Sequence, residues 1–470
     1  MGAHSTLWIA AALLLAALHM AVFDRGLGGD GWAGFALLES LADDGDLWLE
    51  DDHRGVMNGL VGGRDGHLVS QYPPGIVAWD ALPFFAGRAL DRLLPEGLLA
   101  GGADLPPAGR VPRRVFLSAA LIVLARNAAT LLGLACIALA LPRLGFSKRT
   151  TAAATALTFF GGPLLFYSLV GMTHAPTFAL AALLLLLLVR QRETGSPKLA
   201  FAAGLAVGIA VLLRYSAVAL LPGVLLAVSS LSRRGPSPPS PLPEGEGRHH
   251  PPAEDSPLSL RERGARGVRA LTGFALPLLF LPFWWRSAFG TWTVPPYGGT
   301  WQITAASPWN VLFAPVHGLF LFHPALLFAA AGLAILAVRE ASRRSPGWGA
   351  IAAAWFLSVA VLHGWWSEWA NRGGYGQRFL IDALPALAVG FAGWIATARR
   401  PAPHAASALA AALVGWLLFF AAVGGLVPPP PPWPWPQTLG DYAVLGEHPP
   451  GPAELVRALE RASFLLRSLR

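Results

Sequence analysis

The chain has 470 residues, of which 54% are hydrophobic and only 13% are charged, and its formal net charge is +8 at pH 7. A soluble domain carries about 25% charged residues, so this composition excludes an ordinary soluble domain and is typical of a polytopic membrane protein. The basic residues stand mostly in short loops between apolar runs, which argues against nucleic acid as a partner. The one cysteine, Cys136, lies inside an apolar run, so a disulfide framework is excluded.

Apolar runs of about 20 residues are long enough to cross the hydrocarbon core, and they predict an all-α fold with about eleven transmembrane helices. The expected spans are 5–23, 115–141, 150–168, 174–190, 199–213, 215–231, 268–285, 318–338, 349–366, 378–397 and 405–427. Two spans next to Arg214 are short, so they are half-helices or one kinked pair, because arginine seldom faces lipid. Arg126 either faces the protein interior or marks residues 115–125 as an interfacial helix.

The distribution of Lys and Arg predicts the orientation of the chain. The basic short loops fall on the same side as residue 1, and the positive-inside rule makes that side cytoplasmic. We therefore expect a multi-pass protein of the bacterial inner membrane with its N-terminus in the cytoplasm. The first apolar run is interpreted as a span. A cleaved signal peptide is the alternative, but the run has no charged n-region and no A-x-A site before Asp24.

Three segments differ from the apolar runs of the expected membrane domain, residues 1–427. Residues 24–114 form a long extracytoplasmic loop. Residues 232–267 are rich in Pro, Gly, Glu and Arg and predict a disordered cytoplasmic insertion. Residues 428–470 predict a proline-rich segment followed by an amphipathic, basic tail on the extracytoplasmic side.

The long first loop has the pattern of two interfacial helices. Apolar residues follow Trp32 at helical spacing, and a second apolar helix is expected over about 76–94. Asp30 stands just outside the first span, where a carboxylate suits a general base that acts on a lipid-borne substrate. The structural alternative is that Asp30 only N-caps the helix that follows it.

Several short motifs occur in a fixed order along the chain. They are Gly29-Asp30, Asp44-Gly45-Asp46-Leu47, Tyr72-Pro73-Pro74-Gly75, His174 at the start of a span, Arg214 after Gly204 and Gly208, and Gly376-Gln377-Arg378. In this order, and with this membrane layout, the chain resembles the C-superfamily membrane glycosyltransferases, the group of protein mannosyltransferases and bacterial lipid A aminoarabinose transferases. The resemblance covers about residues 5–427.

The resemblance implies a glycosyltransferase that moves a sugar from a polyprenyl-phosphate carrier to an unknown envelope acceptor at the outer face of the inner membrane. It assigns Asp30 as the catalytic base. The residues expected to bind substrate are Asp46, Tyr72, His174, Arg214, Gln377 and Arg378.

Each of these residues also has a plain structural alternative. A guanidinium pairs well with phosphate, so Arg214 and Arg378 at the outer mouth suit a lipid phosphate. Either arginine could instead be an interfacial side chain that snorkels toward water. His174 either positions substrate or serves as a capping or packing histidine.

The chain departs from the family pattern at Gly31, where the family has a second acid directly after the first. The acid pair that would bind metal or acceptor is therefore absent in its usual form, which argues against a divalent cation as cofactor. The His and Cys spacing does not resemble a zinc site, so we predict no metal site.

Two other classes of function stay open at the level of sequence. A secondary transporter or lipid flippase also has broken helices and buried arginines, but transporters tend to contain paired repeats, and the chain has no evident internal duplication. A catalytically inactive relative that only binds a lipid-linked glycan is the third hypothesis, and Gly31 is the feature that supports it.

Overall fold

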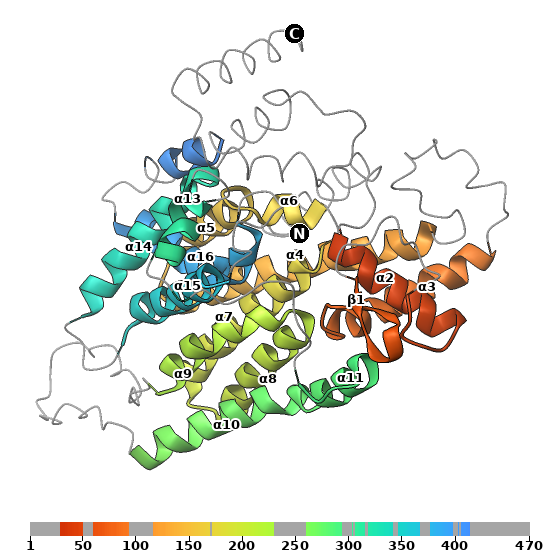
Figure 1. Cartoon of the computed structure of the whole chain (residues 1–470). Helices are drawn as coiled ribbons and strands as arrows, with labels where there is room; N and C mark the ends of the chain where they lie inside the picture. Colours follow the sequence, from red (N-terminus) through yellow and green to blue (C-terminus); the bar gives the residue numbers. More distant parts are fainter. Residues whose placement is uncertain are drawn as a thin grey trace, which may run out of the picture.

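The computed structural model describes residues 29–49, 60–93, 116–169, 172–229, 260–293, 303, 306–314, 318–341, 346–366, 377–397, 403 and 406–413. Over these residues the chain is a bundle of helices with one small hairpin (Figure 1). The predicted span 5–23, the tail 428–470 and residues 232–259 of the predicted insertion lie outside the described residues. The all-α polytopic fold is confirmed.

The first loop folds into a group of short elements at one end of the bundle (Figure 1). They are α2 (Gly29–Asp43), β1 (Leu60–Gly62), η2 (Arg64–Gly66), β2 (Leu68–Ser70) and α3 (Gly75–Leu93). Both predicted helices are confirmed. The antiparallel hairpin, in which Val61 lies opposite Val69, was not predicted, because two strands of three residues are too short to give a periodic signal.

Helix α2 is enclosed by other parts of the protein. Residues 31–40 are buried on all sides. Trp32 and Phe35 pack against Phe84 of α3, and Leu37 packs with Leu49 and Trp284. The apolar pattern predicted the helix, and the structure adds which elements cover it.

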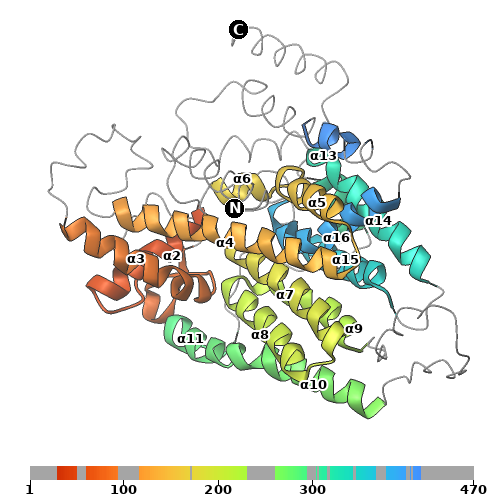
Figure 2. The same ribbon diagram turned by 180° about the vertical axis from the view of Figure 1, so that it is seen from behind.

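The first half of the bundle contains the following elements: α4 (Phe116–Arg143), α5 (Lys148–Phe160), α6 (Leu164–Leu169), α7 (His174–Thr194), α8 (Pro197–Leu213), η4 (Tyr215–Leu220) and α9 (Leu221–Ser229). Helix α4 is continuous through Arg126, whose side chain is buried, so Arg126 faces the protein interior. Viewed from behind, α4 extends from the α2–α3 group across α7 (Figure 2).

The second half of the bundle contains the following elements: α10 (Leu260–Leu278), α11 (Phe280–Phe289), α12 (Ala306–Phe313), α13 (Leu319–Phe322), α14 (Ala325–Glu340), α15 (Trp348–Gly364), η5 (Arg378–Ala383) and α16 (Leu384–Thr397). Helix α10 begins at Leu260, inside the predicted insertion 232–267, so the last eight residues of that prediction are wrong. Arginine and glutamate are good helix formers, and here they continue α10 toward its N-terminus beyond the apolar run.

Within the described residues, four helices are long and apolar enough to cross a membrane, and they cover Leu117–Arg143, His174–Thr194, Gly264–Phe289 and Arg378–Thr397. Shorter apolar helices cover Pro197–Leu213, Tyr215–Ser229 and Trp348–Gly364. Several predicted spans are interrupted. The predicted span 150–168 breaks after Phe160, and the predicted span 318–338 breaks at His323-Pro324. The interruptions expose backbone groups inside the protein, which membrane proteins tolerate where that backbone lines a site or packs on other helices.

Glycines allow the closest helix contacts. A Cβ atom added to Gly204 of α8 would lie 1.8 Å from the carbonyl oxygen of Ala270 in α10. A Cβ atom on Gly332 of α14 would lie 1.9 Å from the carbonyl oxygen of Gly390 in α16. Small residues of this kind let helix backbones approach each other in a bilayer. They fix two helix pairs, α8–α10 and α14–α16.

Candidate active site

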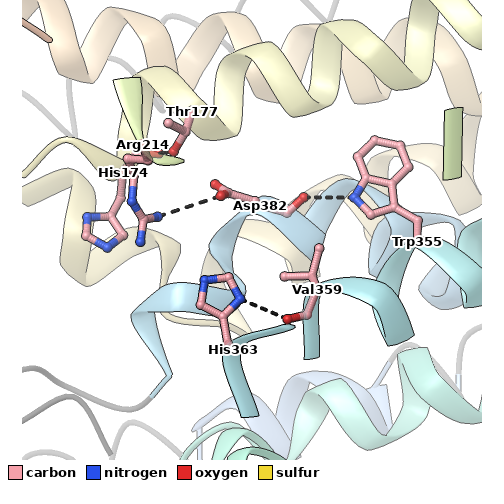
Figure 3. A network of polar contacts seen from close by, with 7 residues as sticks. All are labelled: His174, Thr177, Arg214, Trp355, Val359, His363 and Asp382. Atoms are coloured by element: carbon pink, nitrogen blue, oxygen red, sulfur yellow. Dashed lines mark hydrogen bonds and ion pairs between the residues drawn. The ribbon is translucent and has the colours of Figure 1, made fainter. Parts of the chain in front are cut away.

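The start of α7, the end of α8 and the start of the distant element η5 meet in the bundle. Helix α7 begins at His174, α8 ends at Leu213, and η5 begins at Arg378. Arg214 has an extended backbone (φ −153°, ψ 119°) and separates α8 from η4, so the predicted interruption of the helix at this arginine is confirmed. Figure 3 shows Arg214 between His174 and the carboxylate of Asp382.

Two arginines share one aromatic ring at this place. The guanidinium carbon of Arg214 lies 5.7 Å from the centre of the Phe379 ring, and that of Arg378 lies 5.4 Å from it. The imidazole of His363 stacks on the same ring, with centroids 5.3 Å apart and an interplanar angle of 16°. Phe379 therefore gathers two positive charges, which its electron-rich face partly stabilises.

The negative charge at this site comes from Asp382. Its Oδ2 lies 3.7 Å from Nη1 of Arg214, which is an ion pair but too long for a hydrogen bond. The Asp382 side chain is 1% exposed and that of Arg214 is 10% exposed. Arg378 contacts the sulfur of Met172 at 3.7 Å, and among the described residues no carboxylate lies within ion-pair distance of it. In the described part of the site, the two arginines therefore have one carboxylate between them, which leaves one positive charge without a counter-charge.

His174 is buried beside these charges. Its ring stacks on Tyr167, with centroids 4.9 Å apart. Neither ring nitrogen has a hydrogen-bond partner among the described residues, and the same holds for Nε of Arg378. Native proteins rarely leave such buried polar atoms unsatisfied, so these atoms point to a ligand, an ion or water at this position.

Asp382 is the site residue that the sequence interpretation missed. It lies in the first turn after Arg378, inside the apolar span 378–397, and an ionisable residue within a span is a functional candidate by default. Its backbone carbonyl accepts a hydrogen bond from the indole nitrogen of Trp355 at 3.2 Å (Figure 3). The Thr177 hydroxyl lies near the carboxylate and donates to the carbonyl of His174 at 3.0 Å. Trp355 thus holds the backbone of Asp382, whereas neither carboxylate oxygen has a hydrogen-bond partner among the described residues.

The Tyr-Pro-Pro-Gly motif lies against the same end of α8. A Cβ atom added to Gly75 would lie 2.4 Å from the carbonyl oxygen of Leu212, so the backbones are in direct contact two residues before Arg214. Tyr72, three residues earlier, is half-buried. The first loop therefore reaches the neighbourhood of the arginines. The role of Tyr72 in binding substrate stays a prediction.

Asp46 has a local structural role. Its Oδ1 accepts a hydrogen bond from the Ser40 hydroxyl at 2.8 Å and another from the backbone nitrogen of Trp48 at 3.0 Å. The carboxylate thereby fixes the turn that follows α2, and its role in binding substrate also stays a prediction. Asp30 is the second residue of α2, and its side chain lies outside the described residues, so neither the base nor the N-cap interpretation is tested.

A second buried ion pair joins the first loop to the bundle. Arg126 of α4 donates from Nε to Oδ1 of Asp80 at 3.2 Å, and its Nη2 donates to Oδ2 of the same carboxylate. The two side chains are 1% and 0% exposed. Burial raises the pKa of Asp80 above its usual value, and the charge of Arg126 opposes that rise. The pair fixes α3 against α4.

Comparisons with known proteins show which solved structures have a similar fold. No protein-family model and no curated protein sequence matches the chain. The chain is similar to the crystal structure of ArnT from Cupriavidus metallidurans in the apo state, with 15% identity and a TM-score of 0.51, over 90% of this chain and 64% of that chain. The same protein bound to undecaprenyl phosphate gives 14% identity and a TM-score of 0.51, over 99% of this chain and 72% of that chain.

The chain shares the fold of the two ArnT structures. It spans less than two thirds of the length of the apo ArnT chain, at 64%. An oligosaccharyltransferase from Archaeoglobus fulgidus, tethered with an acceptor peptide, is more distant, with 12% identity and a TM-score of 0.43, over 97% of this chain and 55% of that chain. The two ArnT structures confirm, at the level of the fold, the resemblance drawn from the ordered motifs.

A metal ion of the kind that an acid pair would hold does not fit the residues described here. Within the described ranges, no group of three His, Cys, Asp or Glu side chains is placed to hold a metal ion. Gly31 also stands where the family has its second acid. The guanidinium groups of Arg214 and Arg378 have only N–H donors and a positive charge, which suit an anion and disfavour a cation.

Proposed function

We propose that the protein is a glycosyltransferase that moves a sugar from a polyprenyl-phosphate carrier to a hydroxyl of an envelope acceptor at the outer face of the bacterial inner membrane. The observation that carries this proposal is the convergence of Arg214 and Arg378 on Phe379 with Asp382 as the described counter-charge. An unbalanced guanidinium suits a phosphate oxygen. The solved structure of ArnT with undecaprenyl phosphate supports a lipid carrier of this class.

In the proposed reaction, Asp30 accepts the proton of the acceptor hydroxyl while the hydroxyl oxygen attacks the anomeric carbon. The bond between that carbon and the phosphate oxygen breaks, and its electron pair stays on the phosphate. Negative charge therefore develops on the departing lipid phosphate, where Arg214 and Arg378 stabilise it. One displacement of this kind inverts the anomeric centre without a covalent enzyme intermediate.

The remaining candidates take supporting roles in this proposal. The buried amide of Gln377 and the unpaired ring nitrogens of His174 are placed to bind sugar hydroxyls or phosphate oxygens. Tyr72 and Asp46 belong to the first loop, which contacts the end of α8 through Gly75. They would bind the acceptor or cover the sugar from the outer side.

The test compares envelope glycans by mass spectrometry in cells with the gene, without it, and with an Asp30→Asn copy. We expect one glycan to lose a sugar when the gene is absent and wild-type protein to restore it. Asn keeps the shape and any helix cap but removes the base, so turnover should fall by about 10²–10⁴-fold. Full restoration by the Asn variant would contradict the role of Asp30.

A second assay separates the other classes of function. Purified protein in lipid vesicles is given polyprenyl-phosphate sugars and an envelope extract as acceptor. A transferase yields a glycosylated product. A flippase moves the labelled lipid between leaflets without product, and an inactive relative binds the lipid with neither result. Either of the last two outcomes would contradict the proposed reaction.

A further inference from the structure

We propose that Asp382 makes the site favour the singly charged donor lipid over the doubly charged lipid phosphate that remains after transfer. Asp382 would thereby promote release of the spent carrier. This inference rests on the proposed function and assigns a specificity-determining role to a residue at the arginine site.

The reaction changes the charge of the lipid phosphate. A polyprenyl-phosphate sugar is a phosphodiester with one negative charge. After the sugar leaves, the lipid carries a phosphate monoester, whose second proton dissociates near pH 6, so it carries about −1.5 to −2 at pH 7. Two arginines with no counter-charge would therefore bind the product more tightly than the donor.

The charges of the described site match the donor. Arg214 and Arg378 supply two positive charges, and Asp382 supplies one negative charge 3.7 Å from Arg214. The resulting net charge of one positive unit balances the single negative charge of a phosphodiester. Asp382 is 1% exposed, so solvent and salt screen its repulsion of a second phosphate charge only weakly.

The geometry of the pair indicates that Asp382 acts through its charge. At 3.7 Å the carboxylate makes no hydrogen bond to Arg214, and Nη1 of Arg214 has no hydrogen-bond partner among the described residues. The guanidinium therefore keeps donors available for a phosphate. In the Asp80–Arg126 pair, by contrast, the carboxylate occupies two donors of the arginine. A carboxylate that only anchored Arg214 would be expected to bind it in that second way.

The experiment measures binding of undecaprenyl phosphate and of its methyl ester to the purified full-length protein in nanodiscs at pH 8. The two lipids differ by one charge and one methyl group. For Asp382→Asn we expect the affinity ratio to shift toward undecaprenyl phosphate by roughly tenfold, because a buried negative charge near the phosphate is removed. Asp382→Glu keeps the charge and should keep the wild-type ratio.

A variant of the other arginine gives the opposite shift. Arg378→Gln removes a positive charge without stranding a described carboxylate, so it should shift the ratio toward the methyl ester. The double variant, Asp382→Asn with Arg378→Gln, restores the net charge and should return the ratio toward that of the wild type. If Asp382→Asn does not fold, the Arg378→Gln shift still tests the charge argument.

The outcomes separate this inference from the proposed function. If Asp382→Asn weakens both lipids equally, Asp382 has only a structural role and the inference is overturned. An unchanged ratio in Arg378→Gln overturns it as well. If the wild type binds neither lipid, the proposed function itself fails and the inference fails with it.

Discussion

In the Asp80–Arg126 pair the guanidinium donates two hydrogen bonds to the carboxylate, whereas Arg214 and Asp382 approach to 3.7 Å and exchange none. The side chains of Asp80, Arg126 and Asp382 are almost fully buried, and that of Arg214 is 10% exposed. The first pair joins α3 of the outer loop to α4. The second lies where α8 ends and η5 begins, beside the arginine that has no described carboxylate, Arg378.

The difference teaches how a structural pair can be distinguished from a binding site when both consist of arginine and aspartate. Guanidinium N–H groups that are hydrogen-bonded to a carboxylate hold two elements together and are not available to a ligand. Guanidinium N–H groups that lie near a carboxylate without a hydrogen bond to it remain available to a ligand. Leaving them unbonded costs stability, and a bound anion would offset that cost. We therefore expect the two pairs to respond to mutation in different ways.

The largest effect on stability is expected for Asp80→Ala. The change leaves the Arg126 charge buried without its partner, which typically costs about 3–5 kcal/mol. Thermal unfolding of the purified protein in detergent measures this loss. Replacing both residues, with Asp80→Ala and Arg126→Met, should recover most of the stability, because no buried charge remains. A single variant as stable as the wild type would contradict a structural role for this pair.

A smaller effect is expected for Asp382→Asn. No hydrogen bond to Arg214 is lost, and that guanidinium keeps its contact with Phe379, so the cost should be about 1 kcal/mol. The same unfolding assay measures it beside Asp80→Ala. Equal losses in the two variants would mean that the pairs have the same role.

The smallest effect on stability is expected for Arg378→Gln. Arg378 is half-buried, and the change leaves no described carboxylate unpaired, so unfolding should shift by no more than about 0.5 kcal/mol. Binding of undecaprenyl phosphate should nevertheless weaken by about tenfold or more, because charge-assisted hydrogen bonds are lost. A loss of stability without a change in binding would show that Arg378 only supports the fold.

The sequence allowed several features of the site to be predicted from single residues. Arg214 was expected to interrupt a helix, because a charge in an apolar run seldom faces lipid, and the structure confirms the break. His174, Gln377 and Arg378 were named from the order of motifs and lie at the same end of the bundle. Asp382 was missed because the surrounding apolar run predicted only a span.

The sequence by itself determined that this is a multi-pass helical membrane protein with a structured first loop, because length, hydropathy and the order of short motifs are properties of the chain alone. Only the tertiary structure decided which charges meet. Arg126 pairs with Asp80 over 46 positions, and Arg214 pairs with Asp382 over 168 positions. Such pairings depend on how the helices pack against each other, and local periodicity carries no information about that contact.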